Sequence, residues 1–100
     1  MIKHIVMWKL KDSLEGKSKL ESMQAMKAML EALIGKVDGL IKLEVGFNIE
    51  SSDSAYDLVL YSEFTDEKAL EAYQVHPDHL VVKKFVAGVR DKRAVVDYLA

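Results

Sequence analysis

The only proline in the chain, Pro77, divides a helical stretch in two. Proline restricts the residue before it to an extended conformation, but it suits the first turn of a helix. One helix is therefore predicted to end at His76 and another to begin at Pro77. The break carries two of the three histidines, His76 and His79, and Tyr73 lies one turn before it. The sequence thus gathers most of its acid–base capacity near neutral pH at a corner between two helices.

Four further stretches are predicted to be strands, and most of them alternate between apolar and polar residues. They cover residues 2–10, 40–49, 56–64 and 93–99. The polar segment 50–54 is typical of a turn, so the second and third strands are expected to form a hairpin.

The first strand is apolar on both of its faces. One face carries His4, Val6 and Trp8, and the other carries Ile5 and Met7. A sheet face in contact with water does not need an apolar centre. We therefore expect the face with Ile5 and Met7 to be covered by another layer.

The region 17–35 is predicted to be a helix. Ser18 followed three residues later by Glu21 indicates a capping box, and apolar residues then recur at helical spacing. The apolar stripe includes Met23 and Met26, whose unbranched side chains adapt to an irregular pocket. Stripes of this kind usually belong to the core, so the alternative is a helix that simply packs on the sheet.

The helices on either side of Pro77 are expected to direct their functional residues inward. Thr65 or Asp66 caps the first of them, whose buried face includes Tyr73. In the second helix His79 lies on the same apolar stripe as Val82, because the two are three residues apart.

The order of elements is strand, helix, strand, strand, helix pair, strand. This order predicts an α+β fold of the ferredoxin-like, split β-α-β type, in which helices cover one face of a four-stranded antiparallel sheet. The right-handed crossover rule then favours the spatial strand order 4-1-3-2. One hundred residues, of which 50% are apolar, are enough for one domain over residues 1–100 but not for two.

Composition excludes several classes of function. The formal net charge is -2 and the 14 basic residues are spread through the sequence, which argues against nucleic acid and membrane surfaces as partners. The chain has no cysteine, so disulfides and thiolate chemistry are excluded. No signal-peptide core or membrane-spanning run is present, and we expect a soluble, cytoplasmic protein.

Four segments together resemble a known family. They are His-Ile-Val at 4–6, the strand at 56–64, Tyr-Gln-Val-His-Pro-Asp-His at 73–79 and Ala-Val-Val-Asp-Tyr at 94–98. In this order they are similar to the Dabb family of stress-responsive dimeric A/B barrel proteins, and the resemblance covers essentially the whole chain.

The resemblance implies a ferredoxin-like protomer whose sheet stacks on that of a second copy, giving a homodimeric α/β barrel. Such a homodimer would cover Ile5 and Met7. Most members of the family have no assigned activity. The characterised ones include a plant polyketide cyclase and a plant hydroxynitrile lyase, which work without a cofactor, and a stress protein that assembles into a ring.

The resemblance also implies a site. It puts His79 in the position of a catalytic histidine and Tyr73 in that of its assisting tyrosine. Methionines of the first helix replace aromatic pocket residues of the cyclase, and Trp8 replaces a smaller aliphatic residue, so the ligand is expected to be smaller than that of the plant enzyme. The residues predicted to bind it are His4, Val6, Trp8, Met23, Met26, His76 and Val82.

Each of these roles has an alternative. For His76 the favoured alternative is that it caps the helix that Pro77 begins, because a histidine before proline at a helix junction is well placed to do so. Asp97 and Tyr98 are interpreted as packing and edge residues of the last strand. No metal is expected, because two histidines across a proline break lack the fixed geometry of a helical pair. The potential ligands would be His4, His76, Asp78 and His79.

Two classes of function remain open. The first is a small-molecule binder or a cofactor-free cyclase or lyase with His79 as general base and Tyr73 as hydrogen-bond donor. The second is a non-catalytic stress-response assembly in which the same residues are structural. The sequence contains no catalytic thiol, phosphate-binding loop or dinucleotide fingerprint.

Overall fold

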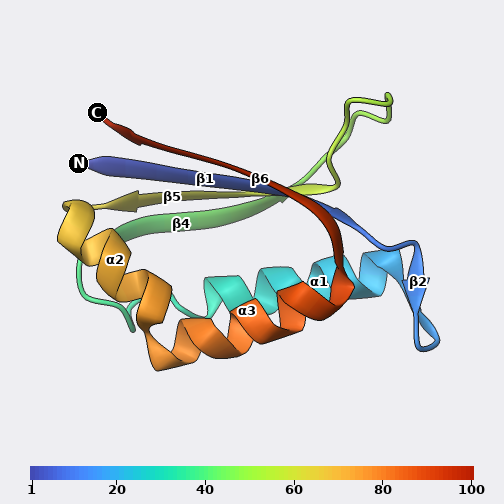
Figure 1. The fold of residues 1–100 in the computed structure, drawn as a ribbon, viewed down its shortest axis with the longest axis horizontal. Coiled ribbons are helices and arrows are strands. Elements are labelled where there is room, and N and C mark those ends of the chain that lie inside the picture. The colour runs from blue at the N-terminus through green and yellow to red at the C-terminus, as the bar shows by residue number, and fades with distance from the viewer.

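Four long strands form one antiparallel sheet in the computed structural model, which describes residues 1–100 (Figure 1). They are β1 (Ile2–Leu10), β4 (Leu40–Phe47), β5 (Leu58–Phe64) and β6 (Arg90–Leu99). The spatial order is β4-β5-β1-β6. Since the predicted strands 1, 2, 3 and 4 correspond to β1, β4, β5 and β6, this is the predicted order 4-1-3-2 read from the opposite edge, and the prediction is confirmed. The predicted α+β, ferredoxin-like fold class is confirmed as well.

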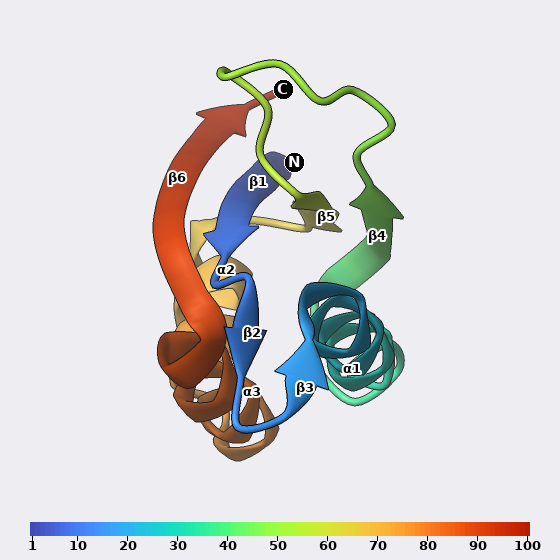
Figure 2. The same ribbon diagram turned by 90° about the vertical axis from the view of Figure 1, so that its right-hand side faces the viewer.

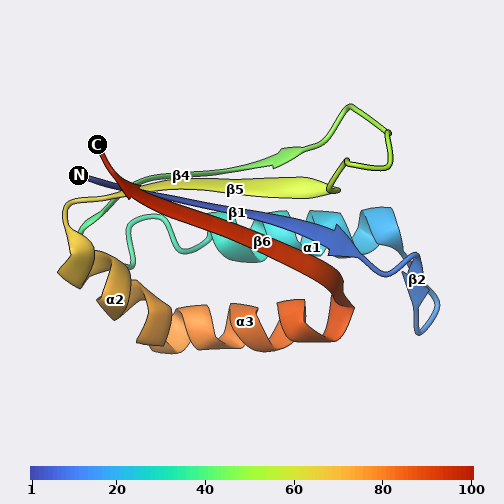
Figure 3. The same ribbon diagram turned by 45° about the horizontal axis from the view of Figure 1, so that its top comes forward.

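Three helices lie on one face of this sheet and leave the other face open (Figures 1 and 3). They are α1 (Lys19–Glu31), α2 (Glu67–Val75) and α3 (Pro77–Val89). As predicted, the helical stretch divides at this point: His76 is the C-cap of α2, and α3 begins at Pro77. None of the helices has the length and hydropathy needed to cross a membrane.

The alternation of β1 decides which of its side chains face the helices. His4, Val6 and Trp8 are buried on the helix-covered side. Ile5 and Met7 point to the open side, where Met7 is 37% exposed. Their register partners on β5 and β6 make the centre of the open face apolar: Val59, Tyr61, Ala94 and Val96.

The N-terminus of α1 forms the predicted capping box. The Ser18 hydroxyl accepts a bond from the Glu21 backbone N–H at 3.1 Å, and the Glu21 carboxylate accepts one from the Ser18 N–H at 3.1 Å. The helix ends at Glu31, before the predicted residue 35. Its apolar pattern continues through the buried Leu33, although bonds of the i to i+3 type have already tightened the last turn.

A short hairpin between β1 and α1 was not predicted. It consists of β2 (Ser13–Leu14) and β3 (Lys17–Ser18), joined by Glu15 and Gly16 with φ of 51° and 80°. Two central residues with positive φ are typical of a type I′ turn, which favours glycine. Strands of two residues are too short to give a recognisable alternation.

Some strand boundaries also differ from the prediction. A bulge between Leu40 and Lys42 leaves Ile41 exposed, although in the sequence it alternates in phase with the buried Leu43 and Val45. A glycine inside a strand often marks a bulge, but Gly46 lies in regular pairing with Val59. The last strand, β6, begins at residue 90 instead of 93.

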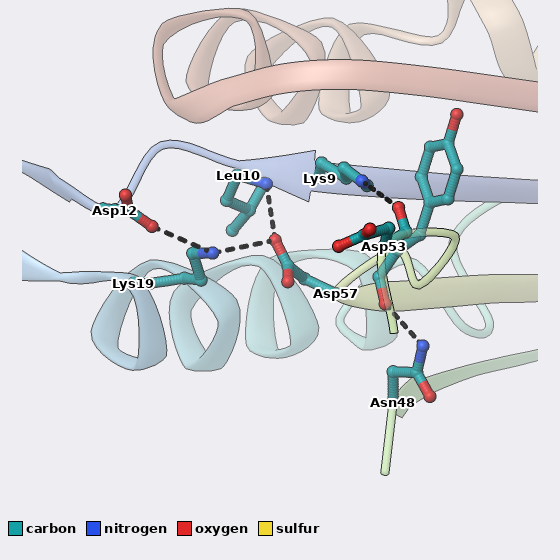
Figure 4. Close-up of polar contacts among 8 residues, drawn as sticks. Lys9, Leu10, Asp12, Lys19, Asn48, Asp53 and Asp57 are labelled. Carbon is teal, nitrogen blue, oxygen red and sulfur yellow. Dashed lines mark hydrogen bonds and ion pairs between the residues drawn. The ribbon is translucent and has the colours of Figure 1, made fainter. Parts of the chain in front are cut away.

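A polar network joins the end of β1 to α1 and to the segment before β5 (Figure 4). The Asp57 carboxylate accepts a bond from the Leu10 N–H at 2.8 Å and lies 3.4 Å from the ammonium of Lys19. Lys19 also contacts Asp12 at 3.2 Å. The Asp57 N–H donates to the backbone carbonyl of Trp8 at 2.8 Å. The network therefore fixes the part of β1 that carries Trp8.

Candidate ligand-binding site

A cavity of about 340 Å³ lies between the covered face of the sheet and α3. Its apolar wall comes from β1, β5, α1 and α3, and includes Val6, Leu60 and Val86. The exposed members of its lining come from the second half of α3 and the beginning of β6, and we call this part the mouth of the cavity: Lys83, Ala87, Arg90 and Arg93. Figure 2 shows this junction, with β6 continuing from the end of α3 and curving along the sheet edge.

His79 lies in the wall of this cavity, in the first turn of α3. It is only 8% exposed, and its Nδ1 atom has no hydrogen-bond partner. Burial is the main cause that lowers the pKa of His79 to about 4. A hydrogen bond to the backbone of Gln74 raises this pKa, whereas the positive charges of Lys83, His4 and Arg93 lower it further. The imidazole is therefore neutral at pH 7 and has a free nitrogen.

The beginning of α3 explains the position of His79. The His76 Nδ1 atom accepts a bond from the Asp78 N–H at 3.1 Å and so caps the helix, with Pro77 in its first turn. Three residues after the cap, the side chain of His79 turns toward the sheet. His76 itself has the capping role that was the alternative to ligand binding.

Tyr73 packs directly behind His79. The two ring centroids are 4.0 Å apart, and the Tyr73 ring also lies 5.0 Å from that of Phe64. Tyr73 is fully buried, and its hydroxyl has no hydrogen-bond partner. Burial raises the pKa of this hydroxyl, so it is a neutral donor. Tyr73 does not line the cavity.

The third histidine, His4, lines the cavity from β1. It is the register partner of Asp97 on β6, and its Nδ1 atom contacts the Asp97 carboxylate. Because a carboxylate only accepts hydrogen bonds, this contact assigns a proton to Nδ1 and orients the ring. Asp97 was interpreted from the sequence as a packing residue; it instead holds His4.

Trp8 lines the cavity next to these polar groups. Its indole is 5% exposed and lies on the helix-covered side of β1. The Nε1 atom is buried without a partner, although it is a hydrogen-bond donor. Two residues of the lining, Trp8 and His79, therefore each have a buried ring nitrogen without a hydrogen-bond partner.

The structure brings together only part of the predicted site. His4, Val6, Trp8, His79 and Val82 line the cavity. Four other predicted residues do not line the cavity: Met23, Met26, Tyr73 and His76. The two methionines belong to the hydrophobic core, which was the alternative interpretation of their apolar stripe. No group of three or more His, Asp or Glu side chains is close enough to hold a metal ion.

Three basic residues of the lining were missed: Lys83, Arg90 and Arg93. In the sequence they belong to the basic residues that are spread along the chain. They converge because α3 leads directly into β6, whose first part lies beside β1. Lys83 follows His79 by one helical turn, and this spacing was the only sequence signal that could have found any of them.

Comparison with known proteins gives one family over nearly the whole chain. A family model described as "Stress responsive A/B Barrel Domain" matches residues 2–100. A stress-response A/B barrel domain-containing protein of Arabidopsis thaliana is 32% identical over 108 aligned positions, which cover 100% of this chain and 37% of the plant protein. The chain spans less than half the length of the plant relatives it matches.

Solved structures give the same fold. A dimeric protein of unknown function with a ferredoxin-like fold from Bacteroides fragilis is 37% identical, with a TM-score of 0.84 and coverage of 97% of this chain and 93% of that one. The hydroxynitrile lyase of Passiflora edulis has a TM-score of 0.81 over 97% of this chain and 90% of its own, but it is only 16% identical. That second likeness concerns the fold alone.

Proposed function

Because the chain belongs to the stress-responsive A/B barrel domain family, we propose that it forms a homodimer in which each protomer binds a small organic ligand between the sheet and α3. The main support for the proposal is the position of His79. This residue belongs to the lining of a cavity of about 340 Å³, and its buried Nδ1 atom has no hydrogen-bond partner. A largely apolar pocket with a few polar groups directed into it is the usual form of a small-molecule site.

The dimer in this proposal uses the open face of the sheet. The apolar residues at its centre include Ile5, Met7 and Val96, the last of which is 57% exposed in the protomer. The Bacteroides fragilis protein, at 37% identity, is dimeric. Covering the face would remove this apolar surface from water, and a stable interface of this kind buries about 1,600 Å² in total.

His79 is proposed to act as a general base without a cofactor. Its neutral form is present at pH 7 and suits removal of a proton from a carbon next to a carbonyl group, as in an aldol-type cyclisation, or from the hydroxyl group of a lyase substrate. A pKa of about 4 makes the free imidazole a weak base. A ligand that stabilises the imidazolium would raise this pKa and improve proton transfer.

The position of Tyr73 favours the second candidate, which is a binding or assembly protein without catalysis. Tyr73 is not part of the cavity lining, and its hydroxyl is buried without a hydrogen-bond partner. In the catalytic proposal this hydroxyl must reach the carbonyl oxygen of the ligand, which requires the Tyr73 ring to turn. In the non-catalytic proposal Tyr73 remains a packing residue against Phe64 and His79.

The experiment is a screen of small aromatic and carbonyl compounds by thermal shift, followed by turnover measurements on those that bind. His79→Gln should abolish or weaken binding and lower any turnover by about 10²–10⁴-fold. His76→Gln is the matched control, because it removes an imidazole that lies outside the cavity. Tyr73→Phe separates the two candidates, since it should lower turnover only if the hydroxyl takes part. A folded His79→Gln dimer with unchanged binding and turnover would refute the role of His79.

A further inference from the structure

The mouth of the cavity carries three cations and no anion. Lys83 comes from α3, Arg90 follows the last residue of that helix, and Arg93 comes from β6. The cavity lining contains no Asp or Glu. None of the three cations forms an ion pair with another residue, although the chain as a whole has an excess of acidic residues.

Exposed cations are usually only solvated, so their convergence alone does not define a ligand. The second observation concerns Trp8, which is also part of the cavity lining. The indole N–H of Trp8 is a donor that cannot accept, and it is buried without a partner. A buried unsatisfied donor is unfavourable, and such groups in native proteins are normally bonded. Nε1 has almost no surface open to solvent, so an acceptor reaches it only when the indole ring turns toward the cavity.

The two observations require the same property from a ligand. Arginine and lysine side chains have donors and no acceptors, and the indole N–H adds another donor at depth. A complementary molecule therefore presents acceptor oxygens, at least one of them charged. The planar guanidinium forks of Arg90 and Arg93 match a carboxylate, which they bind through paired hydrogen bonds.

We propose that the cavity takes a small organic carboxylate, with its carboxylate group among Lys83, Arg90 and Arg93 and a hydroxyl or carbonyl oxygen directed to the N–H of Trp8. The body of the ligand lies against the apolar wall formed by Val6 and its neighbours. This inference rests on the proposed ligand-binding function and specifies the ligand class. A carboxylate there would also lie in the positive field that acts on His79 and would favour its protonated form.

The test compares acids with their neutral amides. The 2-, 3- and 4-hydroxybenzoates and the corresponding hydroxybenzamides have nearly the same shape, and their affinities are measured by isothermal titration calorimetry. We expect the best acid to bind at least about 10-fold more tightly than its amide, because only the acid forms charge-assisted bonds with the arginines. Its binding should weaken as the ionic strength rises from about 0.05 M to about 0.5 M, since salt screens charges at an exposed mouth.

Variants identify the groups responsible. Arg90→Gln and Arg93→Gln should each lower the affinity for the acid by about 3- to 10-fold and leave that for the amide unchanged. Lys36→Gln is the matched control, because Lys36 is an exposed cation outside the cavity lining. Trp8→Phe should weaken both compounds, since it removes the inner donor and keeps an aromatic ring.

The outcomes separate this inference from the proposed function. If acids and amides bind equally and the arginine variants change neither, the cavity binds ligands but the carboxylate assignment is wrong. If phenyl phosphate binds more tightly than every acid, the site is one for phosphate esters and the assignment is again wrong. If none of these compounds binds the folded dimer but a compound from the thermal-shift screen does, the carboxylate inference fails and the proposed ligand-binding function stands. If no compound of either set binds, both fail.

Discussion

Substituting His79 by glutamine should remove much of the protein's sensitivity to mild acid. The pKa of this histidine is lowered from 6.5 to about 4 in the folded protein, chiefly because the ring is buried. Between these two values the unfolded chain binds a proton that the folded chain does not bind. The free energy of unfolding therefore falls as the pH falls from about 6.5 to about 4, and this contribution is constant below that range.

The magnitude follows from the difference in pKa. The difference is 6.5 minus about 4, and each unit corresponds to about 1.36 kcal/mol. The full effect of His79 is therefore about 3 kcal/mol, of which about 2 kcal/mol should be lost between about pH 7 and about pH 4.5. This is a large part of the stability of an ordinary domain, which is about 5–15 kcal/mol.

The assay is urea unfolding of the parent and of His79→Gln at several pH values and one protein concentration, which must be fixed because dimerisation adds to apparent stability. Both proteins contain the same carboxylates, so their common acid sensitivity cancels in the difference. The parent should lose about 2 kcal/mol more than the variant over this range. Parallel curves, or an NMR titration in which the His79 ring of the folded protein takes up its proton near its ordinary pKa, would refute the reasoning.

Three further predictions concern the sheet, the cavity and the first helix. Met7→Lys should shift the equilibrium from dimer to monomer in sedimentation experiments, whereas the control Gln24→Lys on the exposed side of α1 should not. If Met7→Lys and the parent protein dimerise with equal affinity, the interface lies elsewhere. Trp8→Ala should lower the free energy of unfolding by about 3 kcal/mol and let the enlarged cavity bind bulkier apolar probes, as measured by urea unfolding and by thermal shift. Ser18→Ala should lower the free energy of unfolding by about 1 kcal/mol, because it removes the hydroxyl that accepts the hydrogen bond from the Glu21 N–H. A change near zero would mean that this bond does not stabilise the N-terminus of α1.

The sequence was sufficient for the fold where one side of an element is buried. The alternation of β1 marks both of its ends and the face that carries His4 and Trp8, because a strand with one covered face repeats every two residues. Pro77 marks the division between α2 and α3 for a covalent reason, since it restricts the residue before it. These signals are local and can be recognised without the rest of the chain.

The sequence was insufficient where burial gives no pattern. The strand β6 is exposed along most of its length on both faces, so nothing in its first residues, beginning at Arg90, distinguishes strand from loop. The two-residue strands β2 and β3 are too short for any period. The early end of α1 was missed because the buried Leu33 continues the apolar pattern past the helix.

The candidate site divides in the same way. His79 was found because it lies in a distinctive local segment and on the apolar stripe of its helix. Arg90 and Arg93 belong to a helix cap and a strand, so they share no single period, and only the path of the chain brings them to the cavity. Asp97 meets His4 across 93 residues of sequence, a pairing that strand register decides and local sequence does not.

The position of β1 between β5 and β6 also determines when folding can be completed. The first strand pairs with the last, so the sheet lacks one side until β6 has left the ribosome. Before then β1 is an edge strand whose unpaired N–H and C=O groups can pair with another chain, and whose Ile5 and Met7 are uncovered. Joining segments so distant in sequence requires closing a long loop, which slows folding. The edge of β1 is therefore covered on this side only when β6 docks, which makes the last strand of the sheet the one that removes this site of pairing with other chains.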